Sequence, residues 1–213
     1  MTILLVGALG LGWGFASDRI AARWPEHEDG SRRGIDWRTL LVVLMGGASF
    51  AATVSRFGDQ PGPLLFVSVY VVALVLLFAT DLDQKLLPDV ITLPLIPFAL
   101  VAFATGAGPY VHTVEDLAWA AAAAVGVPLG LYLLAIPFGA GAIGQGDLKL
   151  LVSAGLLAGA LKVFYGLVAG ALLAGVVVAV LLVSRRLSMK SFVPYGPFLI
   201  AGTLWSILAL TSP

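Results

Sequence analysis

The feature that most constrains this chain is a succession of long apolar runs separated by short polar or Gly/Pro-rich stretches. A helix needs about 20 apolar residues to cross a membrane, so several runs must extend into their flanks. Lipid offers no hydrogen-bond partners to backbone N–H and C=O groups, so a spanning segment must be a helix or part of a closed barrel. The alternating apolar and polar pattern of a barrel strand is missing, so the runs predict helices. We expect eight spans, at residues 2–22, 40–55, 64–80, 90–107, 117–138, 148–163, 166–184 and 193–210.

The composition agrees with this pattern. The chain is 60% hydrophobic and 11% charged, with a mean hydropathy of +1.01, far from the balance of a soluble domain. Residues 2–16 lack the basic residue and the small-residue cleavage site of a signal peptide, so this run is expected to be a retained first span. The sequence therefore predicts an all-α, polytopic membrane protein, a bundle of about eight transmembrane helices in one domain over residues 1–213.

The charges and the missing cysteines narrow the function. The chain has no cysteine, which excludes disulfides, iron–sulfur clusters and thiolate zinc sites. Its formal net charge is zero, and we expect the lipid bilayer, not a nucleic acid, as its surroundings.

Lysines and arginines predict the orientation, because cytoplasmic loops carry an excess of both. With eight spans, the loops fall into two sets, one on each side of the membrane. Most lysines and arginines lie in the first set, and only Arg56 and Lys162 lie in the second. The first set is expected to be cytoplasmic, which places both termini outside the cell membrane. It includes the polar loop 17–38, which we interpret as a solvated topology signal. The first set comprises Arg19, Arg23, Arg32, Arg33, Arg38, Lys85, Lys149, Arg185, Arg186 and Lys190.

Four aspartates lie at span edges in two of these cytoplasmic loops: Asp81, Asp83 and Asp89 in one, Asp147 in the other. Carboxylates near a bilayer are costly and are by default a hypothesis for a functional site. Each also has a structural alternative. Asp147 alone would be interpreted as the N-cap of the following helix, and the others as a polar loop with Lys85 as counter-charge.

The glycines around Asp147 favour a functional role. Gly144 and Gly146 remove side chains beside Gln145 and let the backbone approach a ligand, which an N-cap does not require. When two carboxyl groups share one site, the ionised one can activate water and the protonated one can donate a proton to the leaving group. The helix dipole favours the anion at a helix start and the neutral acid at a helix end. We therefore expect Asp147 to be the resting base and Asp81 the resting acid.

Three stretches, in this order, resemble a known family. They are "DLDQKLLPD" (residues 81–89), "GQGDLKLL" (144–151) and "VPYGPFL" (193–199). Together with the eight-span layout, they are similar to the type IV prepilin peptidases, which belong with the G-x-G-D membrane aspartic proteases.

The resemblance implies the roles of the site residues. Asp81 and Asp147 match the catalytic aspartates, with Asp83 as the rival of Asp81. The implied substrate is a prepilin or pseudopilin precursor, with a short basic leader and an apolar helix, cut after a glycine at the cytoplasmic face. Asp83 and Asp89 would hold the leader or simply be solvated, and Gly144 and Gly146 would let the loop close over the peptide.

The chain departs from the family in its first cytoplasmic loop. Many members carry a domain with paired Cys-x-x-Cys motifs there, whereas this chain has the cysteine-free loop 17–38. No metal is expected, and S-adenosylmethionine would be a cofactor only if the family's methyltransferase activity is retained.

Two other functions stay open at this stage. The first is an ion- or proton-coupled transporter that uses Asp81 and Asp147 as a relay. A relay needs acids near the midplane, whereas these lie at loop edges. The second is an inactive scaffold for pilus or secretion assembly, which sequence cannot distinguish from a working protease.

Overall fold

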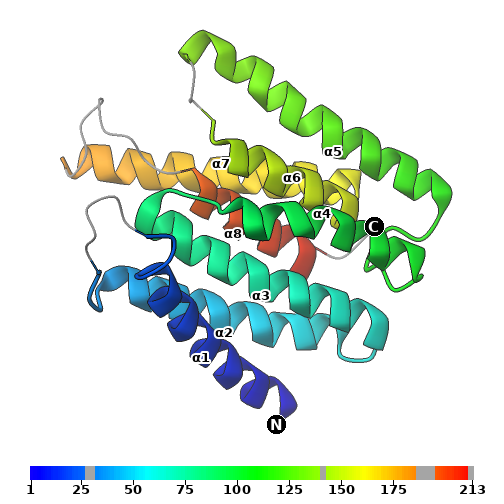
Figure 1. The fold of residues 1–213 in the computed structure, drawn as a ribbon, viewed down its shortest axis with the longest axis horizontal. Helices are drawn as coiled ribbons and strands as arrows, with labels where there is room; N and C mark the ends of the chain where they lie inside the picture. Colours follow the sequence, from blue (N-terminus) through cyan, green and yellow to red (C-terminus); the bar gives the residue numbers. More distant parts are fainter. Residues whose placement is uncertain (27–31, 140–142, 186–194, 211–213) are drawn as a thin grey trace.

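A computed structural model describes residues 1–26, 32–139, 143–185 and 195–210. Within this part the chain forms eight α-helices, one short 3-10 helix and no strand (Figure 1), which confirms the predicted all-α fold. The helices are α1 (Thr2–Ala21), α2 (Trp37–Phe57), α3 (Pro61–Gln84), α4 (Asp89–Ala104), α5 (Val114–Ala135), η1 (Ile136–Phe138), α6 (Gln145–Ala158), α7 (Ala160–Val183) and α8 (Gly196–Leu208).

Five of these helices, α1, α2, α3, α5 and α7, are long and apolar enough to cross a membrane. Helices α4 and α8 are apolar but shorter, with 16 and 13 residues. Large apolar side chains on the outer faces of α5 and α7 are exposed, among them Leu129, Leu133, Leu172 and Val176. Exposure of this extent on several long helices is what a lipid environment accommodates. The chain is therefore a multi-pass membrane protein.

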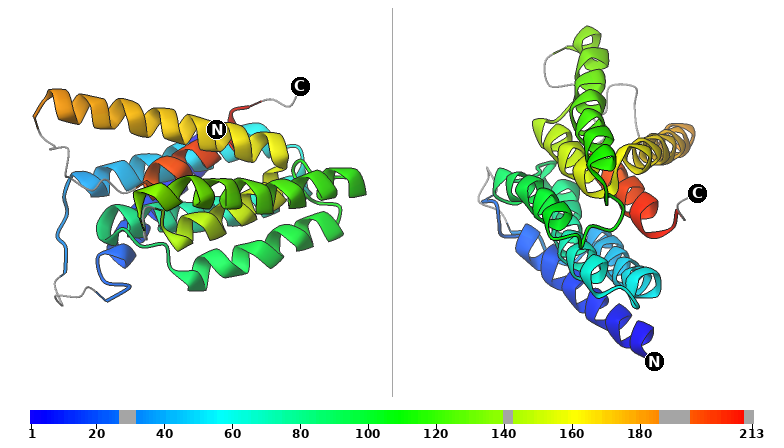
Figure 2. Two further views of the ribbon diagram at one scale, coloured as in Figure 1. Left: turned by 90° about the horizontal axis from the view of Figure 1, so that it is seen from above. Right: turned by 90° about the vertical axis from the view of Figure 1, so that its right-hand side faces the viewer.

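Successive helices run back and forth along the bundle (Figure 1). The carboxyl ends of α1 and α3 and the amino ends of α2, α4 and α6 consequently share one end, which we call the aspartate end. The opposite end holds the carboxyl ends of α2 and α4 and the amino ends of α3, α5 and α7. Figure 2 shows that α1 and α5 lie at opposite edges of the molecule.

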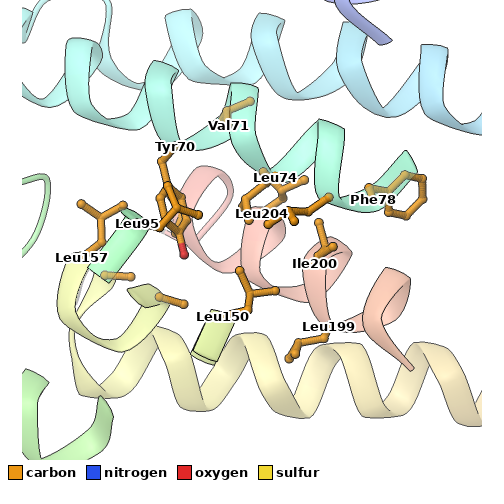
Figure 3. Close-up of a cluster of buried hydrophobic side chains, with 14 of the residues drawn as sticks. Tyr70, Val71, Leu74, Phe78, Leu95, Leu150, Leu157, Leu199, Ile200 and Leu204 are labelled. Atoms are coloured by element: carbon orange, nitrogen blue, oxygen red, sulfur yellow. The ribbon is translucent and has the colours of Figure 1, made fainter. Parts of the chain in front are cut away.

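The core lies where α3, α6 and α8 meet (Figure 3). Leu74 of α3, Leu150 of α6 and Ile200 of α8 are fully buried there. One polar contact crosses this core, a 3.0 Å hydrogen bond between the Tyr70 hydroxyl and Ser153 Oγ. Because an unpaired buried hydroxyl is costly, this bond also sets the register between α3 and α6, the two helices that carry the aspartates.

The boundary between the sixth and seventh spans differs from the prediction. We expected a break at residues 164–165, but α6 ends at Ala158, and Gly159, at φ +83°, makes the turn. Lys162 is therefore not a loop residue; it lies in the first turn of α7 and is only 7% exposed. Hydropathy missed the turn because a glycine between alanines does not interrupt an apolar run.

The loop between the first two helices is shorter than predicted. We expected residues 17–38 to be loop, but α1 continues to Ala21 and α2 begins at Trp37, capped by Asp36. Arg186, Lys190 and the start of the third motif, residues 193–194, lie outside the described residues.

Candidate active site

Asp81 lies in the last turn of α3, which ends at Gln84. The helix stops because Lys85 adopts a left-handed conformation, with φ 56°, and donates its backbone N–H to the Asp81 carbonyl. Asp81 is only 5% exposed, although it sits at the end of a helix. The carbonyl end of α3 thus holds a carboxyl group in a place that disfavours negative charge.

Asp147 is the third residue of α6 and is 8% exposed. The alternative interpretation of Asp147 as the N-cap is wrong, because Gly144 occupies that position. The Gly144 backbone N–H instead hydrogen-bonds the Asp147 carboxylate from the first turn. This bond and the amino end of the helix both stabilise a negative charge on Asp147.

Gly196, at the start of α8, brings the two aspartates together. A Cβ atom on Gly196 would overlap Asp81 Oδ2 and lie 3.1 Å from Asp147 Oδ1. Both oxygens therefore lie within 3.1 Å of one point, so one small molecule can contact both. These same two oxygens are buried and have no hydrogen-bond partner among the described residues. Buried carboxylate oxygens without partners are rare and indicate a site for chemistry or for a ligand.

A pocket of about 370 Å³ opens onto this pair. It lies between the end of α3, the residues that lead into α4 and the start of α6. Its rim carries an ion pair, in which Lys149 Nζ donates to Asp89 Oδ1 at 2.6 Å. The lining residues are Asp81, Lys85, Leu86, Leu87, Pro88, Asp89, Gly144, Gln145, Gly146, Asp147 and Lys149.

The two glycines of the second motif have different surroundings. A Cβ on Gly146 would lie 2.6 Å from Leu87 Cβ, so Gly146 lets the start of α6 pack against the segment between α3 and α4. A Cβ on Gly144 would lie 3.0 Å from Asp147 Oδ2. Both glycines line the pocket, and each keeps the backbone close to a group that shapes it.

Asp83 lies away from the pocket that holds Asp81. Its side chain is 2% exposed and pairs with Arg33, at 2.6 Å, and with Arg38, at 3.0 Å. It is absent from the residues that line the pocket. The structure therefore brings Asp81, Asp89, Gly144, Gly146 and Asp147 together and leaves Asp83 outside.

Asp83 belongs to a larger ion-pair network that ties the loop between α1 and α2 to α3. Fully buried Asp18 of α1 pairs with Arg19 and Arg33 and accepts a 2.8 Å hydrogen bond from Thr39 of α2. Next to it, the Gln84 amide donates to the carbonyls of Ala21 and Pro25. Asp83 and Gln84, in the last turn of α3, are thus anchored to α1 and to the loop that follows it.

Tyr195 and Gly196 were missed as site residues. Both belong to the third motif of the sequence, to which we had given no role. Tyr195 is half-buried near the Asp147 carboxylate. Only the folded chain shows that the start of α8 reaches both aspartates, because α8 is far from either in sequence.

The chemistry available is that of two carboxyl groups. Among the described residues no group of three or more His, Cys, Asp or Glu side chains is placed to hold a metal ion. Two facing carboxyls, one favoured as anion and one as acid, can take a proton from water and give one to a bound substrate.

Comparisons with known proteins point to one family. Residues 68–181 match the model of the type IV leader peptidase family. A protein of Burkholderia pseudomallei named prepilin leader peptidase/N-methyltransferase is 32% identical over 179 residues, which cover 80% of this chain and 54% of that protein. One of the same name from Dickeya chrysanthemi is 34% identical over 182 residues, 82% of this chain and 61% of that protein. The chain thus spans little more than half the length of these relatives. No solved structure matches it significantly.

Proposed function

Because this chain belongs to the type IV leader peptidase family, we propose that it is a membrane-embedded aspartic endopeptidase that removes the basic leader from prepilin-like precursors. The observation that carries the proposal is the pair of buried oxygens, Asp81 Oδ2 and Asp147 Oδ1, which have no hydrogen-bond partner among the described residues and both lie within 3.1 Å of where a Cβ of Gly196 would be. The names of the relatives support the substrate class.

The proposed reaction uses both carboxyl groups. Asp147, ionised at the start of α6, takes a proton from a water molecule whose oxygen attacks the carbonyl carbon of the scissile peptide bond. Asp81, protonated at the end of α3, donates to the carbonyl oxygen and yields a tetrahedral diol. As the C–N bond breaks, the proton on Asp147 passes to the departing amine and the diol returns a proton to Asp81. Both carboxyls end the cycle as they began it.

The rim of the pocket supplies a place for the leader. Asp89 is 58% exposed and pairs with Lys149, whose side chain is 28% exposed. A basic side chain of a substrate can replace Lys149 on Asp89 at little cost, since exposed ion pairs are weak. We propose Asp89, and not Asp83, as the acidic contact of the leader, because two arginines already neutralise Asp83 in a buried place.

The proposal covers leader removal, the reaction for which two carboxyl groups suffice. Placement of the aspartate end at the cytoplasmic face of the cell membrane is part of the proposal. It rests on the lysines and arginines that gather at this end, among them Arg23, Arg38 and Lys85.

Co-expression with a candidate prepilin tests the function. Asp81→Asn and Asp147→Asn keep the size of each side chain but remove its acid–base capacity, so each should lower leader cleavage by about 100-fold or more. Asp83→Asn serves as the matched control, since it lies two residues from Asp81 but outside the pocket. It should lower protein yield, yet leave cleavage per folded molecule within about 10-fold of the wild type.

The opposite pattern, with cleavage lost in Asp83→Asn and kept in Asp81→Asn, would overturn the assignment within the first motif. Wild-type protein that is folded and cleaves none of the precursors offered would instead favour the transporter or the inactive scaffold.

A further inference from the structure

A second, larger pocket lies at the opposite end of the bundle from the aspartates. It has a volume of about 1180 Å³ and is enclosed by the end of α2, the segment between α4 and α5, and the start of α7. These elements meet on the side of Figure 1 where the carboxyl terminus is marked. None of its lining residues has a role in the proposed hydrolysis.

Two cations form the inner part of this pocket. Lys162 is buried, lies 4.1 Å from the centre of the Tyr110 ring and donates to the carbonyls of Ser206 and Leu210. Arg56 donates to the same Leu210 carbonyl and hydrogen-bonds the Tyr110 side chain. Two positive charges thus converge on the carboxyl end of α8.

Among the described residues no carboxylate balances these charges. The carboxyl end of a helix supplies roughly half a negative charge. Neither Arg56 nor Lys162 is paired with a carboxylate among the described residues. The one acidic side chain of the pocket, Asp116, accepts hydrogen bonds from the backbone of His112 and Thr113. Asp59 and Glu115 are exposed and do not line it. A cation in a low-dielectric place without a counter-ion is costly, so the pocket favours an anion.

The rim of the pocket is apolar and aromatic, unlike its inner part. Trp119, Leu161 and Tyr165 line it and are 66%, 61% and 50% exposed. Trp and Tyr with exposed rings at the end of a membrane bundle are typical of the lipid headgroup region. The occupant must therefore carry a negative group for the two cations and apolar chains for the rim.

We propose that this pocket binds the headgroup of an anionic phospholipid, with its phosphate near Arg56 and Lys162 and its acyl chains beside Trp119 and Tyr165. Basic pockets between membrane helices bind acidic headgroups through the same combination of charge and apolar contact. The bound lipid would join α2, α7 and α8, and so stabilise the opposite end of the bundle.

Thermal unfolding in detergent tests this inference without any peptidase assay. Phosphatidylglycerol should raise the unfolding temperature of the wild type by about 5 °C more than phosphatidylcholine. Arg56→Gln and, separately, Trp119→Ala should each lose at least half of that difference. Arg23→Gln, which removes an exposed charge at the aspartate end, should keep all of it. Asp81→Asn should also keep it, which separates this inference from the proposed function.

Equal unfolding temperatures in the two lipids would overturn the proposal, as would an equal loss in Arg56→Gln and Arg23→Gln. If inorganic phosphate alone reproduces the whole effect, the site binds a free anion and the lipid assignment is wrong. Trp119 is 66% exposed, so Trp119→Ala should still fold. This variant therefore tests the lipid site even if Arg56→Gln does not fold.

Discussion

At the scale of single residues, Gly196 is a glycine whose missing side chain leaves room beside both carboxyl groups of the site. Any side chain there would enter the space that Asp81 Oδ2 and Asp147 Oδ1 share. The two oxygens come from two other helices, α3 and α6, so a Cβ at Gly196 would displace at least the Asp81 carboxyl from its place beside Asp147. The requirement for glycine here is thus one of space and not of backbone conformation.

We therefore predict that Gly196→Ala lowers leader cleavage by about 100-fold or more, the contribution of a correctly placed acid–base group. Gly175→Ala in α7 is the matched control, because a Cβ there meets nothing within 4 Å. It should leave cleavage unchanged and leave stability equal or slightly greater, since alanine is the better helix former. Initial rates per folded molecule, with yield from size-exclusion chromatography, make the comparison. An unchanged rate in Gly196→Ala would show that the carboxyls do not act as a close pair.

At the scale of elements, the ion-pair network between α1, its loop and α3 explains why a short connection can hold the end of α3 in place. Arg33 contacts Asp18, Asp36 and Asp83, two of which are almost completely buried. Removing one partner from a buried ion pair leaves an uncompensated charge, which costs far more than losing an exposed pair.

Arg33→Met should accordingly destabilise the protein by roughly 3–5 kcal/mol. Lys149→Gln, which breaks the exposed pair with Asp89, should cost less than about 1 kcal/mol. Unfolding of both variants in the same detergent gives the two values. Because Asp83 and Gln84 belong to the same last turn of α3 as Asp81, Arg33→Met should also lower kcat more than it changes KM. Equal stabilities of the two variants would mean that the network is solvated and contributes little.

At the scale of the whole molecule, the alternating helices place the two ends of the bundle on opposite sides of a membrane. The natural absence of cysteine makes this orientation easy to test, because a single introduced thiol is the only one present. Glu26 lies at the aspartate end and Asp59 at the opposite end, and both are exposed.

In intact cells, a membrane-impermeant maleimide should label Asp59→Cys and leave Glu26→Cys unlabelled until the cells are permeabilised. This pattern follows if the end rich in lysine and arginine is cytoplasmic. The reverse pattern would invert the orientation and would place the carboxyl pair outside the cell.

The sequence by itself determined the number and kind of the elements, because membrane helices are defined by local composition and every one satisfies its own backbone. It also indicated Asp81, Asp147 and the glycines of the second motif, since costly residues at span edges stand out against an apolar background. It could not locate the turn at Gly159, which no polar residue marks, and it placed Lys162 in a loop for that reason.

Only the tertiary structure decided which side chains meet. Asp81 and Asp83 are two residues apart in the last turns of one helix, yet one faces Asp147 and the other faces Arg33. Their directions depend on how α3 is rotated against α6 and α1, and that rotation is set by packing contacts far apart in the chain, such as the one between Tyr70 and Ser153. The place of Gly196 between the carboxyls, and of two cations at the end of α8, depends on the same contacts, which no local pattern contains.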